Sequence, residues 1–248
     1  MGDLVKELDV RQAKSAEDFK EGRILLIDKP LTWSSFDVVN KVRIMLRANL
    51  GIRKIKAGHA GTLDPLATGL LVLCIGKATK RINELMGLDK EYVADITFGA
   101  VTPSYDLETE ISETFETGHI TKEKIEQSLK NFLGVQTQTP PVYSAVRSAG
   151  RRGYQHARSG NGDVEMPTRI VEFFELELLS FKHPVATVRI KCSKGTYIRS
   201  LAHDLGLALD CGAHLSSLRR TANGNLRVDA AMSFDYFNEV LKEIRTNA

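Results

Sequence analysis

The sequence predicts a mixed α/β (α+β) fold in a single domain. Segments with the spacing of helices and segments with the alternation of strands follow one another along the chain, without an internal repeat. The chain has 248 residues, of which 42% are hydrophobic and 26% charged, so it can bury one sizeable core. No apolar run approaches the ~20 residues that a membrane-spanning helix needs, so we expect no membrane insertion.

The first predicted elements are a short strand and a capped helix. Residues 23–27 are apolar and end at Asp28-Lys29-Pro30, which indicates a strand followed by a turn. Ser34 or Ser35 can accept a hydrogen bond from the first turn of a helix. Three apolar residues then recur at helical spacing: Val38, Val42 and Met45.

Four further elements are predicted up to residue 134. Residues 70–75 have the composition of a buried strand, and residues 78–86 that of a helix ending at Gly87. Residues 91–98 alternate as a strand does, with four residues on one face: Tyr92, Ala94, Ile96 and Phe98. A helix is predicted from Thr121 to its end at Gly134, with an apolar stripe of Ile125, Leu129 and Leu133.

The second half begins with a stretch rich in Pro, Gly, Ser and Arg at residues 138–162, which we interpret as a long surface loop. The elements predicted after it are paired strands at residues 170–181 and 185–192, a helix at residues 196–209, a strand at residues 215–221 that turns at Asn223-Gly224, and a capped helix at residues 233–244.

An acidic residue lies in a loop of glycines and small residues, directly before a predicted strand. In the run GHAGTLDPLATGLL, residues 58–71, Gly61 and Gly69 permit a positive φ or a close approach, and Pro65 fixes the backbone after Asp64. A carboxylate on a rigid loop that enters the core is held in place and open to a ligand. Asp-Pro is also a common turn dipeptide, so spacing alone leaves Asp64 as either a catalytic or a turn-forming residue.

Positive charge is concentrated in the second half. The whole chain has a net charge of +3, whereas residues 143–227 contain thirteen Lys and Arg against seven Asp and Glu, a net charge of +6. In the predicted loop, arginines are interleaved with rings: Arg147, Arg151, Arg152 and Arg158 with Tyr143, Tyr154 and His156. Cations bind phosphates and rings stack on bases, so this composition suits RNA. The alternative is a mobile polar loop on a solvated surface.

Cysteine and histidine spacing indicates neither disulfides nor a metal site. Cys74, Cys192 and Cys211 are far apart and form no CxxC pair, and the six histidines show no HExxH spacing. We expect buried, reduced thiols, no metal and no cofactor. The N-terminus lacks the apolar centre of a signal peptide, which predicts a cytoplasmic protein.

The run at residues 58–71 resembles the signature of the TruB family, the bacterial tRNA pseudouridine-55 synthases. The likeness extends, in the family's order, over residues 22–232. Further matches are the opening strand and helix at residues 24–42, KEY at residues 90–92, PPVYSA at residues 140–145, KGTYIRSL at residues 194–201 and LRRT at residues 218–221. The resemblance implies the pseudouridine synthase fold, a mixed central β-sheet flanked by helices with an RNA-binding loop insertion.

The resemblance implies catalytic roles for three residues. Asp64 would be the catalytic carboxylate, and Arg199 would keep it ionised and fix its rotamer. Tyr92 would stack on the target uracil and handle the proton lost from C5. From spacing alone, Arg199 would be a helix-surface ion-pair partner and Tyr92 a core residue with a satisfied hydroxyl.

The other matches imply contacts with RNA. His59 would pack against the RNA near a flipped nucleotide, and Leu218 would line the uracil pocket; a lone loop histidine is otherwise a surface residue. Lys77 and Lys80 follow the predicted strand at a helix start, where phosphates bind. Tyr197 belongs to the third motif and is expected to contact RNA, as are Arg147, Arg151 and Arg152 of the insertion.

The implied activity is the isomerisation of uridine 55 in the T-arm of tRNA to pseudouridine. The bond from C1′ to N1 breaks, the uracil turns, and C1′ joins C5, so no redox equivalent is consumed. The carboxylate has three routes, attack on C1′, addition to C6 or proton removal at C2′, and the sequence does not choose among them. The uridine must leave its stack. We expect tRNA as the partner, no guide RNA, and a monomer.

The expected domains are an N-terminal extension at residues 1–21, a catalytic domain at residues 22–232, and a short C-terminal helix at residues 233–248 without the PUA domain that many members append. Thr32 stands where the family usually has Gly, which leaves the geometry of that turn open. Three rival functions remain: a guide-RNA-dependent synthase, a non-catalytic RNA chaperone and a carboxylate-based glycosidase.

Overall fold

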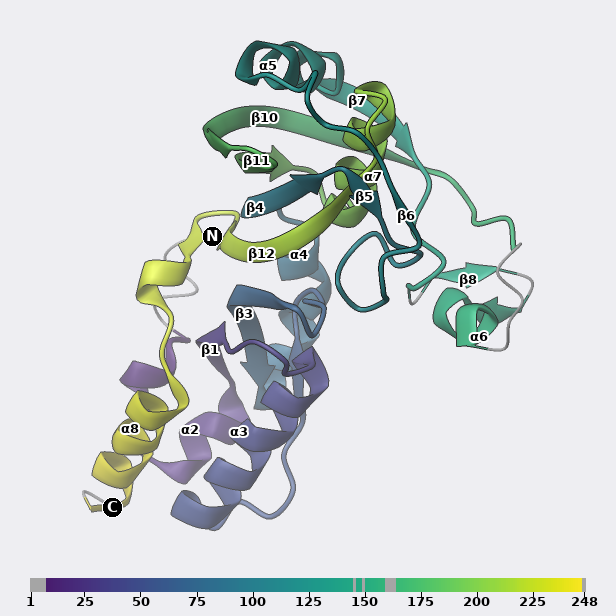
Figure 1. The fold of residues 1–248 in the computed structure, drawn as a ribbon. Helices are drawn as coiled ribbons and strands as arrows, with labels where there is room; N and C mark the ends of the chain where they lie inside the picture. Colours follow the sequence, from purple (N-terminus) through teal and green to yellow (C-terminus); the bar gives the residue numbers. More distant parts are fainter. Residues whose placement is uncertain (1–7, 145, 149, 159–163, 247–248) are drawn as a thin grey trace. The chain divides into compact units, whose positions relative to one another are not determined.

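A computed structural model describes residues 8–144, 146–148, 150–158 and 164–246 of the chain. Contacts divide it into two compact units: unit 1 is formed by Met1–Lys90 and Arg219–Ala248, and unit 2 by Glu91–Leu218. Each unit packs helices against a β-sheet (Figure 1). The mixed α/β fold class predicted from the sequence is confirmed.

Unit 1 is built on β1, β3 and the end of β12, hydrogen-bonded in that order. β1 and β3 are antiparallel, from Arg23 opposite Ile75 to Lys29 opposite Gly69. Its elements are η1 (Val10–Gln12), α2 (Ala16–Glu21), β1 (Arg23–Lys29), α3 (Ser35–Leu50), β2 (Ala57–His59), β3 (Ala67–Ile75), η2 (Gly76–Arg81), α4 (Ile82–Met86), the last residues of β12 (Ala213–Asn223), β13 (Leu226–Arg227), η3 (Val228–Ala230) and α8 (Phe234–Thr246).

The strands of unit 1 are buried on both faces. Leu25 and Ile27 of β1 join a core with residues of α2, α3 and α8, such as Phe19. Ile24 and Leu26, on the other face, join a second core with Leu85 of α4. Burial on both faces explains why these strands are continuous apolar runs rather than alternating ones.

The helix ends of unit 1 agree with the sequence in two cases. Ser34 Oγ accepts from Asp37 N at 3.1 Å while Asp37 Oδ2 accepts from Ser34 N at 2.9 Å, so a capping box starts α3. Ser233 Oγ accepts from Tyr236 N at 3.1 Å at the start of α8. The single helix predicted at residues 78–86 is wrong in part, because the 3₁₀ helix η2 runs to Arg81 before α4 begins.

The N-terminal segment contributes to this core. Val10 and Phe19 are both fully buried and belong to the same apolar cluster as Leu25. Ser15 caps α2, since its side chain accepts from Asp18 N. The described part of the segment predicted as an extension therefore packs in unit 1, and the domain limits after residues 21 and 232 stay predictions.

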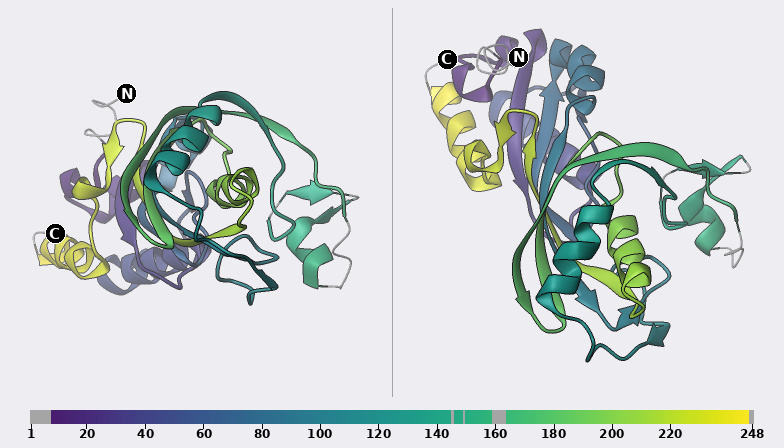
Figure 2. Two further views of the ribbon diagram at one scale, coloured as in Figure 1. Left: turned by 45° about the horizontal axis from the view of Figure 1, so that its top comes forward. Right: turned by 90° about the horizontal axis from the view of Figure 1, so that it is seen from above.

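In unit 2, the strands are hydrogen-bonded in the order β12, β4, β11, β10, β7. Helices α5 and α7 lie side by side against one face of this curved sheet (Figure 2). Its elements are β4 (Lys90–Phe98), β5 (Ala100–Val101), β6 (Glu113–Thr114), α5 (Lys122–Asn131), β7 (Gly134–Gln138), β8 (Arg147–Ser148), β9 (Arg151–Arg152), α6 (Gly153–Arg158), β10 (Arg169–Lys182), β11 (Val185–Cys192), α7 (Ile198–Ala208) and the first residues of β12.

Two predictions for unit 2 need correction. α5 ends at Asn131, and Leu133 lies beyond it with 42% of its surface exposed. The amides of Phe132 and Leu133 bond to carbonyls three residues back, which tightens the last turn and ends the helix. The surface loop predicted at residues 138–162 is wrong for most of its described part, because it contains the β8–β9 hairpin and α6; residues 145, 149 and 159–162 lie outside the described residues.

The remaining strand predictions are confirmed. β4 alternates buried and half-buried residues along its length, with Tyr92 on the buried face. β10 and β11 pair antiparallel. β12 turns at Asn223-Gly224 into β13, with Asn223 opposite Leu226. The three cysteines are free and buried, as expected.

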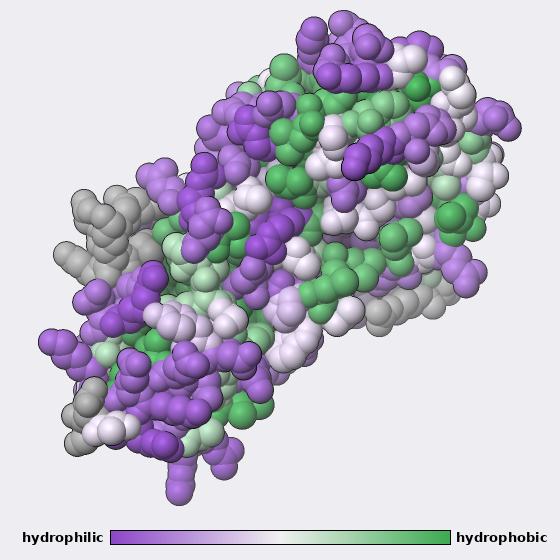
Figure 3. Space-filling model, turned by 60° about the vertical axis from the view of Figure 1, so that its left-hand side comes forward, coloured by the Kyte–Doolittle hydropathy of each residue, from purple (hydrophilic) through white to green (hydrophobic). Residues whose placement is uncertain are grey.

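The surface drawn in Figure 3 is mainly hydrophilic, with apolar residues in separate patches. Within residues 8–246, apart from the gaps given above, no helix is long and apolar enough to cross a bilayer. The same residues contain no group of three or more His, Cys, Asp or Glu placed to hold a metal ion.

We predict that Gly69→Ala destabilises the protein by about 2–4 kcal/mol. Gly69 has φ 98°, and a Cβ there would lie 2.3 Å from the carbonyl oxygen of Arg220. Gly118→Ala is the matched control, because nothing lies within 4 Å of a Cβ at that position. Denaturant unfolding measures both variants, and equal midpoints for the two would contradict the prediction.

Candidate functional site: a carboxylate loop and a buried arginine

Asp64 lies in the loop between β2 and β3 of unit 1 and is partly exposed. The backbone is fixed on both sides of it. Ala67 N donates to the Asp64 carbonyl at 3.0 Å. Leu63 N donates to Ser35 Oγ at 2.8 Å, and this hydroxyl donates back to the Leu63 carbonyl at 3.0 Å. The rigid loop predicted around Asp64 is therefore present.

A buried arginine from β12 holds the two ends of this loop. Arg220 is 2% exposed. Its Nε donates to the Leu70 carbonyl at 2.7 Å, and its two Nη atoms donate to Gly61 O at 3.1 Å and Thr62 O at 3.3 Å. The planar guanidinium makes several bonds in fixed directions, so one side chain fixes the backbone before and after Asp64.

A buried lysine holds the middle of the same loop. The Lys29 ammonium is fully buried and donates to three carbonyls, Trp33 O at 2.5 Å, Pro30 O at 2.9 Å and Pro65 O at 3.3 Å. Burial lowers the pKa of Lys29 to about 8, although the nearby Asp64 charge opposes this shift. Lys29 and Arg220 thus place two positive charges close to the Asp64 loop.

The turn before α3 contains a residue that departs from the family pattern. Thr32 has φ 70°, a conformation that β-branched residues rarely adopt and that glycine adopts readily. Its N–H donates to the Pro65 carbonyl at 2.9 Å, so the strained turn is tied to the Asp64 loop. The geometry left open by the sequence is therefore the one that glycine would favour.

We predict that Lys29→Met destabilises the protein by about 1–3 kcal/mol at pH 7, because the three carbonyls lose their donor. The folded-state pKa of about 8 lies below the ordinary 10.5, so between these values the unfolded chain binds more protons. Wild-type stability should therefore rise, relative to the variant, from pH 8 to 10.5. Unfolding at several pH values tests this, with exposed Lys242→Met as the control; a constant or falling difference would count against it.

The other predicted residues of unit 1 lie at two places. His59 is on β2, where burial and the Arg220 charge lower its pKa while a hydrogen bond with the Gly61 backbone opposes the shift, so its ring is neutral at pH 7. Lys77 and Lys80 are exposed on η2. Lys77 Nζ lies 2.7 Å from a Glu21 carboxylate oxygen, so any phosphate would have to compete with that ion pair.

In unit 2, Arg199 is held in the first turn of α7 with 3% of its surface exposed. Its Nη1 donates to Tyr143 O at 3.0 Å and to Ser104 O at 3.2 Å. Its Nε lies 3.6 Å from Oδ2 of Asp106, which is also buried. Arg199 is therefore a buried, oriented cation and not the helix-surface ion pair that spacing alone suggested.

The start of α7 is also bound to the root of the insertion. Gln138, at the end of β7, accepts from Tyr197 N at 2.8 Å and donates to the Tyr197 carbonyl at 3.0 Å. The Arg169 guanidinium lies 5.2 Å from the centre of the Tyr197 ring, a cation–π distance. The backbone of Tyr197 thus fixes the start of α7. Its side chain is half-buried, so part of the ring is accessible.

The insertion presents its arginines on a short hairpin. Arg147 of β8 lies opposite Arg152 of β9, and Arg151 lies opposite Ser148. All three arginines are exposed. Like charges directly opposite each other destabilise a hairpin, so this arrangement favours an anionic partner. The ring nitrogen Nε2 of His156 on α6 hydrogen-bonds the Ser148 carbonyl at 2.9 Å, which gives His156 a structural role.

The two remaining predicted residues also belong to unit 2. Tyr92 is 8% exposed on β4, and Leu218 is half-buried on β12. Unit 1 thus contains His59 and Asp64 close to one buried arginine, and unit 2 contains Tyr197 and Arg199 on one helix start.

Sequence reasoning missed Lys29, Arg220 and Asp106. For Arg220 a signal was present, because neighbouring side chains of a strand point to opposite faces, so two adjacent arginines place one inward. Arg219 forms the outward pair, with both its Nη atoms on Asp28 at 2.9 and 2.7 Å. Asp106 lies in a region without regular spacing and gave no signal.

Two protein-family models match the chain. The model for the TruB family pseudouridylate synthase (N terminal domain) matches residues 47–198, and the model for the tRNA pseudouridylate synthase B C-terminal domain matches residues 199–247. The chain belongs to the TruB family. This confirms the family resemblance that the sequence motifs indicated.

Named relatives agree with this assignment. The tRNA pseudouridine synthase B of Phocaeicola vulgatus is 51% identical over 226 residues, which cover 91% of this chain and 96% of that protein. The protein of the same name from Flavobacterium johnsoniae is 50% identical over 227 residues, covering 91% of this chain and 99% of the relative.

Solved structures share the fold. The chain matches the structure of a Cbf5-Nop10-Gar1 complex with a TM-score of 0.69 and 29% identity, over 94% of its own length and 62% of the matched chain. An H/ACA RNP bound to a substrate RNA containing 2′-deoxyuridine matches with a TM-score of 0.66 and 27% identity, over 92% and 56%. The chain thus spans less than two thirds of these longer chains, and the pseudouridine synthase fold expected from the sequence is confirmed.

Proposed function

We propose that this protein isomerises uridine to pseudouridine at position 55 in the T-arm of tRNA, as a cytoplasmic monomer without guide RNA. The observation that carries the proposal is the Asp64 loop, in which two buried cations and a serine hold the backbone around a partly exposed carboxylate. Family membership and relatives about half identical, named tRNA pseudouridine synthase B, support the substrate class.

Asp64 serves as the catalytic carboxylate in this proposal. The bond from C1′ to N1 breaks, the uracil turns within the site, C1′ joins C5, and the hydrogen on C5 leaves to solvent while N1 gains a proton. Every non-hydrogen atom of the nucleotide is retained and one proton is exchanged with solvent, so a single ionised carboxylate suffices for any of the three routes, at C1′, C6 or C2′.

Arg199 and Tyr92 act in the same reaction, Arg199 as an oriented cation and Tyr92 by stacking on the uracil. His59 and Leu218 contact the flipped nucleotide. Phosphates bind Lys77, Lys80 and the exposed arginines of the insertion, Arg147, Arg151 and Arg152. The support for these roles is the motif match together with the burial of Arg199 and the exposure of the insertion arginines.

Release of tritium from C5-labelled uridine in a bare T-arm hairpin tests the proposal. We expect release without guide RNA, and none from a hairpin in which the target uridine is replaced by cytidine. A guide-dependent synthase would release tritium only after guide RNA is added, and an RNA chaperone would release none. A glycosidase would liberate free uracil, which chromatography detects.

A further inference from the structure

A basic surface lies in unit 1, outside the residues discussed so far. Residues 38–63 contain six Lys and Arg and no Asp or Glu. The six cations are on α3 and on the segment after it: Lys41, Arg43, Arg47, Arg53, Lys54 and Lys56. We call residues 51–56, between α3 and β2, the basic loop.

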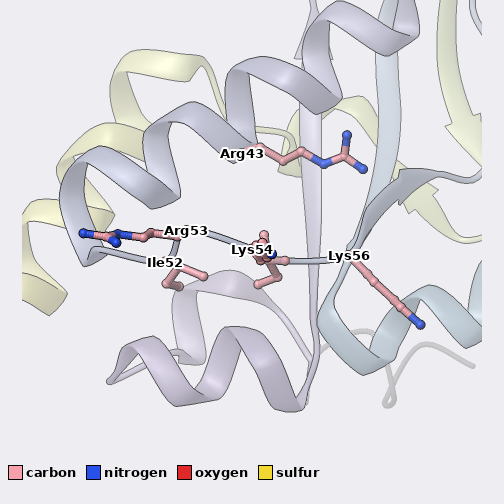
Figure 4. A pocket seen from close by; sticks show the side chains of 6 residues that line it. Arg43, Ile52, Arg53, Lys54 and Lys56 are labelled. Carbon is pink, nitrogen blue, oxygen red and sulfur yellow. The ribbon is translucent and has the colours of Figure 1, made fainter.

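The basic loop borders a cavity of about 470 Å³. Its lining residues are Arg43, Ile52, Arg53, Lys54, Ile55 and Lys56. Ile52 is buried and anchors the loop in the core, while the three cations of the loop are exposed. Figure 4 shows the Arg53 side chain extending toward one end of the loop and the Arg43 and Lys56 side chains toward the other. The charges are thus spread along the loop and do not converge on one point.

In the described residues, the cations of the basic loop form no ion pair with an acidic side chain. Several other exposed cations of unit 1 lie against carboxylates, for example Lys77 beside Glu21 and Lys20 beside Glu17. Within the described part of the chain, no salt bridge joins any cation of the basic loop to a carboxylate. Arg43, which also lines the cavity, donates to the Ala57 carbonyl at 2.7 Å. Uncompensated positive charge of this kind attracts a polyanion.

We propose that the basic loop binds successive phosphates of the substrate RNA, away from the flipped uridine. A row of cations fits the spaced charges of a nucleic-acid backbone, whereas a single small anion needs converging donors. Lys56 directly precedes β2, and its carbonyl accepts from Gly76 N at 2.8 Å, so the end of the loop is anchored to the start of η2. His59 is the third residue after Lys56, about 10 Å along the strand, and the loop extends farther still. This inference rests on the function proposed above.

The test compares two triple variants that remove the same charge. The first is Arg53→Gln, Lys54→Gln, Lys56→Gln in the basic loop. The control is Lys122→Gln, Lys124→Gln, Lys130→Gln, three exposed lysines of α5 in unit 2. Both sets are exposed, so thermal unfolding should show both variants folded. Affinity for a full-length tRNA transcript is measured across a range of salt concentrations.

We expect the basic-loop variant to bind tRNA roughly tenfold or more weakly at 0.1 M salt, with a salt slope shallower by about 2–3 than that of the control variant. In a phosphate ethylation interference experiment, ethylation at certain phosphates should weaken binding to the wild type and leave binding to the basic-loop variant unchanged. Replacement by the other cation, Arg53→Lys with Lys54→Arg and Lys56→Arg, should restore most of the affinity.

Equal affinity and equal slope for the two variants would overturn the inference and leave the surface to a protein partner. The proposed function fails by a different result, the absence of tritium release from wild-type enzyme on the same tRNA. If the wild type isomerises uridine and both variants bind tRNA equally well, the inference about the basic loop is rejected and the proposed function stands.

Discussion

Asp64→Asn is expected to lower the rate of tritium release by at least ~10³-fold while RNA binding stays within about threefold of wild type. The substitution removes one negative charge and keeps the shape of the side chain. The loop should persist, because its bonds to Arg220, Lys29 and Ser35 use backbone atoms of neighbouring residues. Single-turnover kinetics on the labelled hairpin and filter binding measure the two effects separately.

The control is Asp235→Asn, an exposed carboxylate in the first turn of α8 of the same unit. It removes the same charge, so a general electrostatic effect on RNA binding would appear in both variants. We expect Asp235→Asn to retain wild-type turnover. If Asp64→Asn retains more than about a tenth of the wild-type rate, Asp64 is not the catalytic residue.

Arg199→Lys is expected to lower kcat by about 10–100-fold, with a smaller effect on KM. The guanidinium binds the Ser104 and Tyr143 carbonyls through one nitrogen and faces Asp106 with another. A lysine ammonium is a single point and cannot keep this orientation. Combination with Asp106→Asn should cost less than the sum of the two changes, since both disturb one arrangement.

Arg189→Lys is the matched control for this substitution. Arg189 lies on β11 of the same unit and pairs at the surface with Glu177, so its exchange should leave kcat unchanged. Thermal unfolding of Arg199→Lys separates a stability effect from a catalytic one, because rates are compared below its unfolding midpoint. A kcat within threefold of wild type would refute the role of Arg199.

Local rules predicted the elements whose determinants are close in sequence. A serine cap, expected at Ser34 or Ser35, starts α3 at Ser34; strict alternation marked β4, and Asn223-Gly224 marked the final hairpin. The geometry of the Asp64 loop was also foreseeable, because Pro65 restricts the backbone locally and the glycines permit the positive φ and close approach that the loop needs.

The missed features depend on partners far away along the chain. Arg220 is buried because carbonyls about 150 residues earlier, such as Leu70 O, accept its hydrogen bonds. Lys29 combines two nearby acceptors, Trp33 O and Pro30 O, with one 36 residues later, Pro65 O. Hairpin β8–β9 has two residues in each strand, too few for an alternating pattern to appear. Apolar spacing assigned Leu133 to α5, but in the structure a tightened turn ends that helix before Leu133.

Gln138 and Tyr143 restrict how this enzyme can be re-engineered. Gln138 hydrogen-bonds the backbone of Tyr197, and the Tyr143 carbonyl accepts from Arg199. Both ends of residues 138–143, which lead into the insertion, are therefore hydrogen-bonded to the start of α7. Replacing the insertion together with residues 138–143 would therefore also disturb the position of Arg199. Exchanges confined to the tip, from Arg147 to Arg152, leave these hydrogen bonds intact and, under the proposed function, are the place to change the preference for RNA.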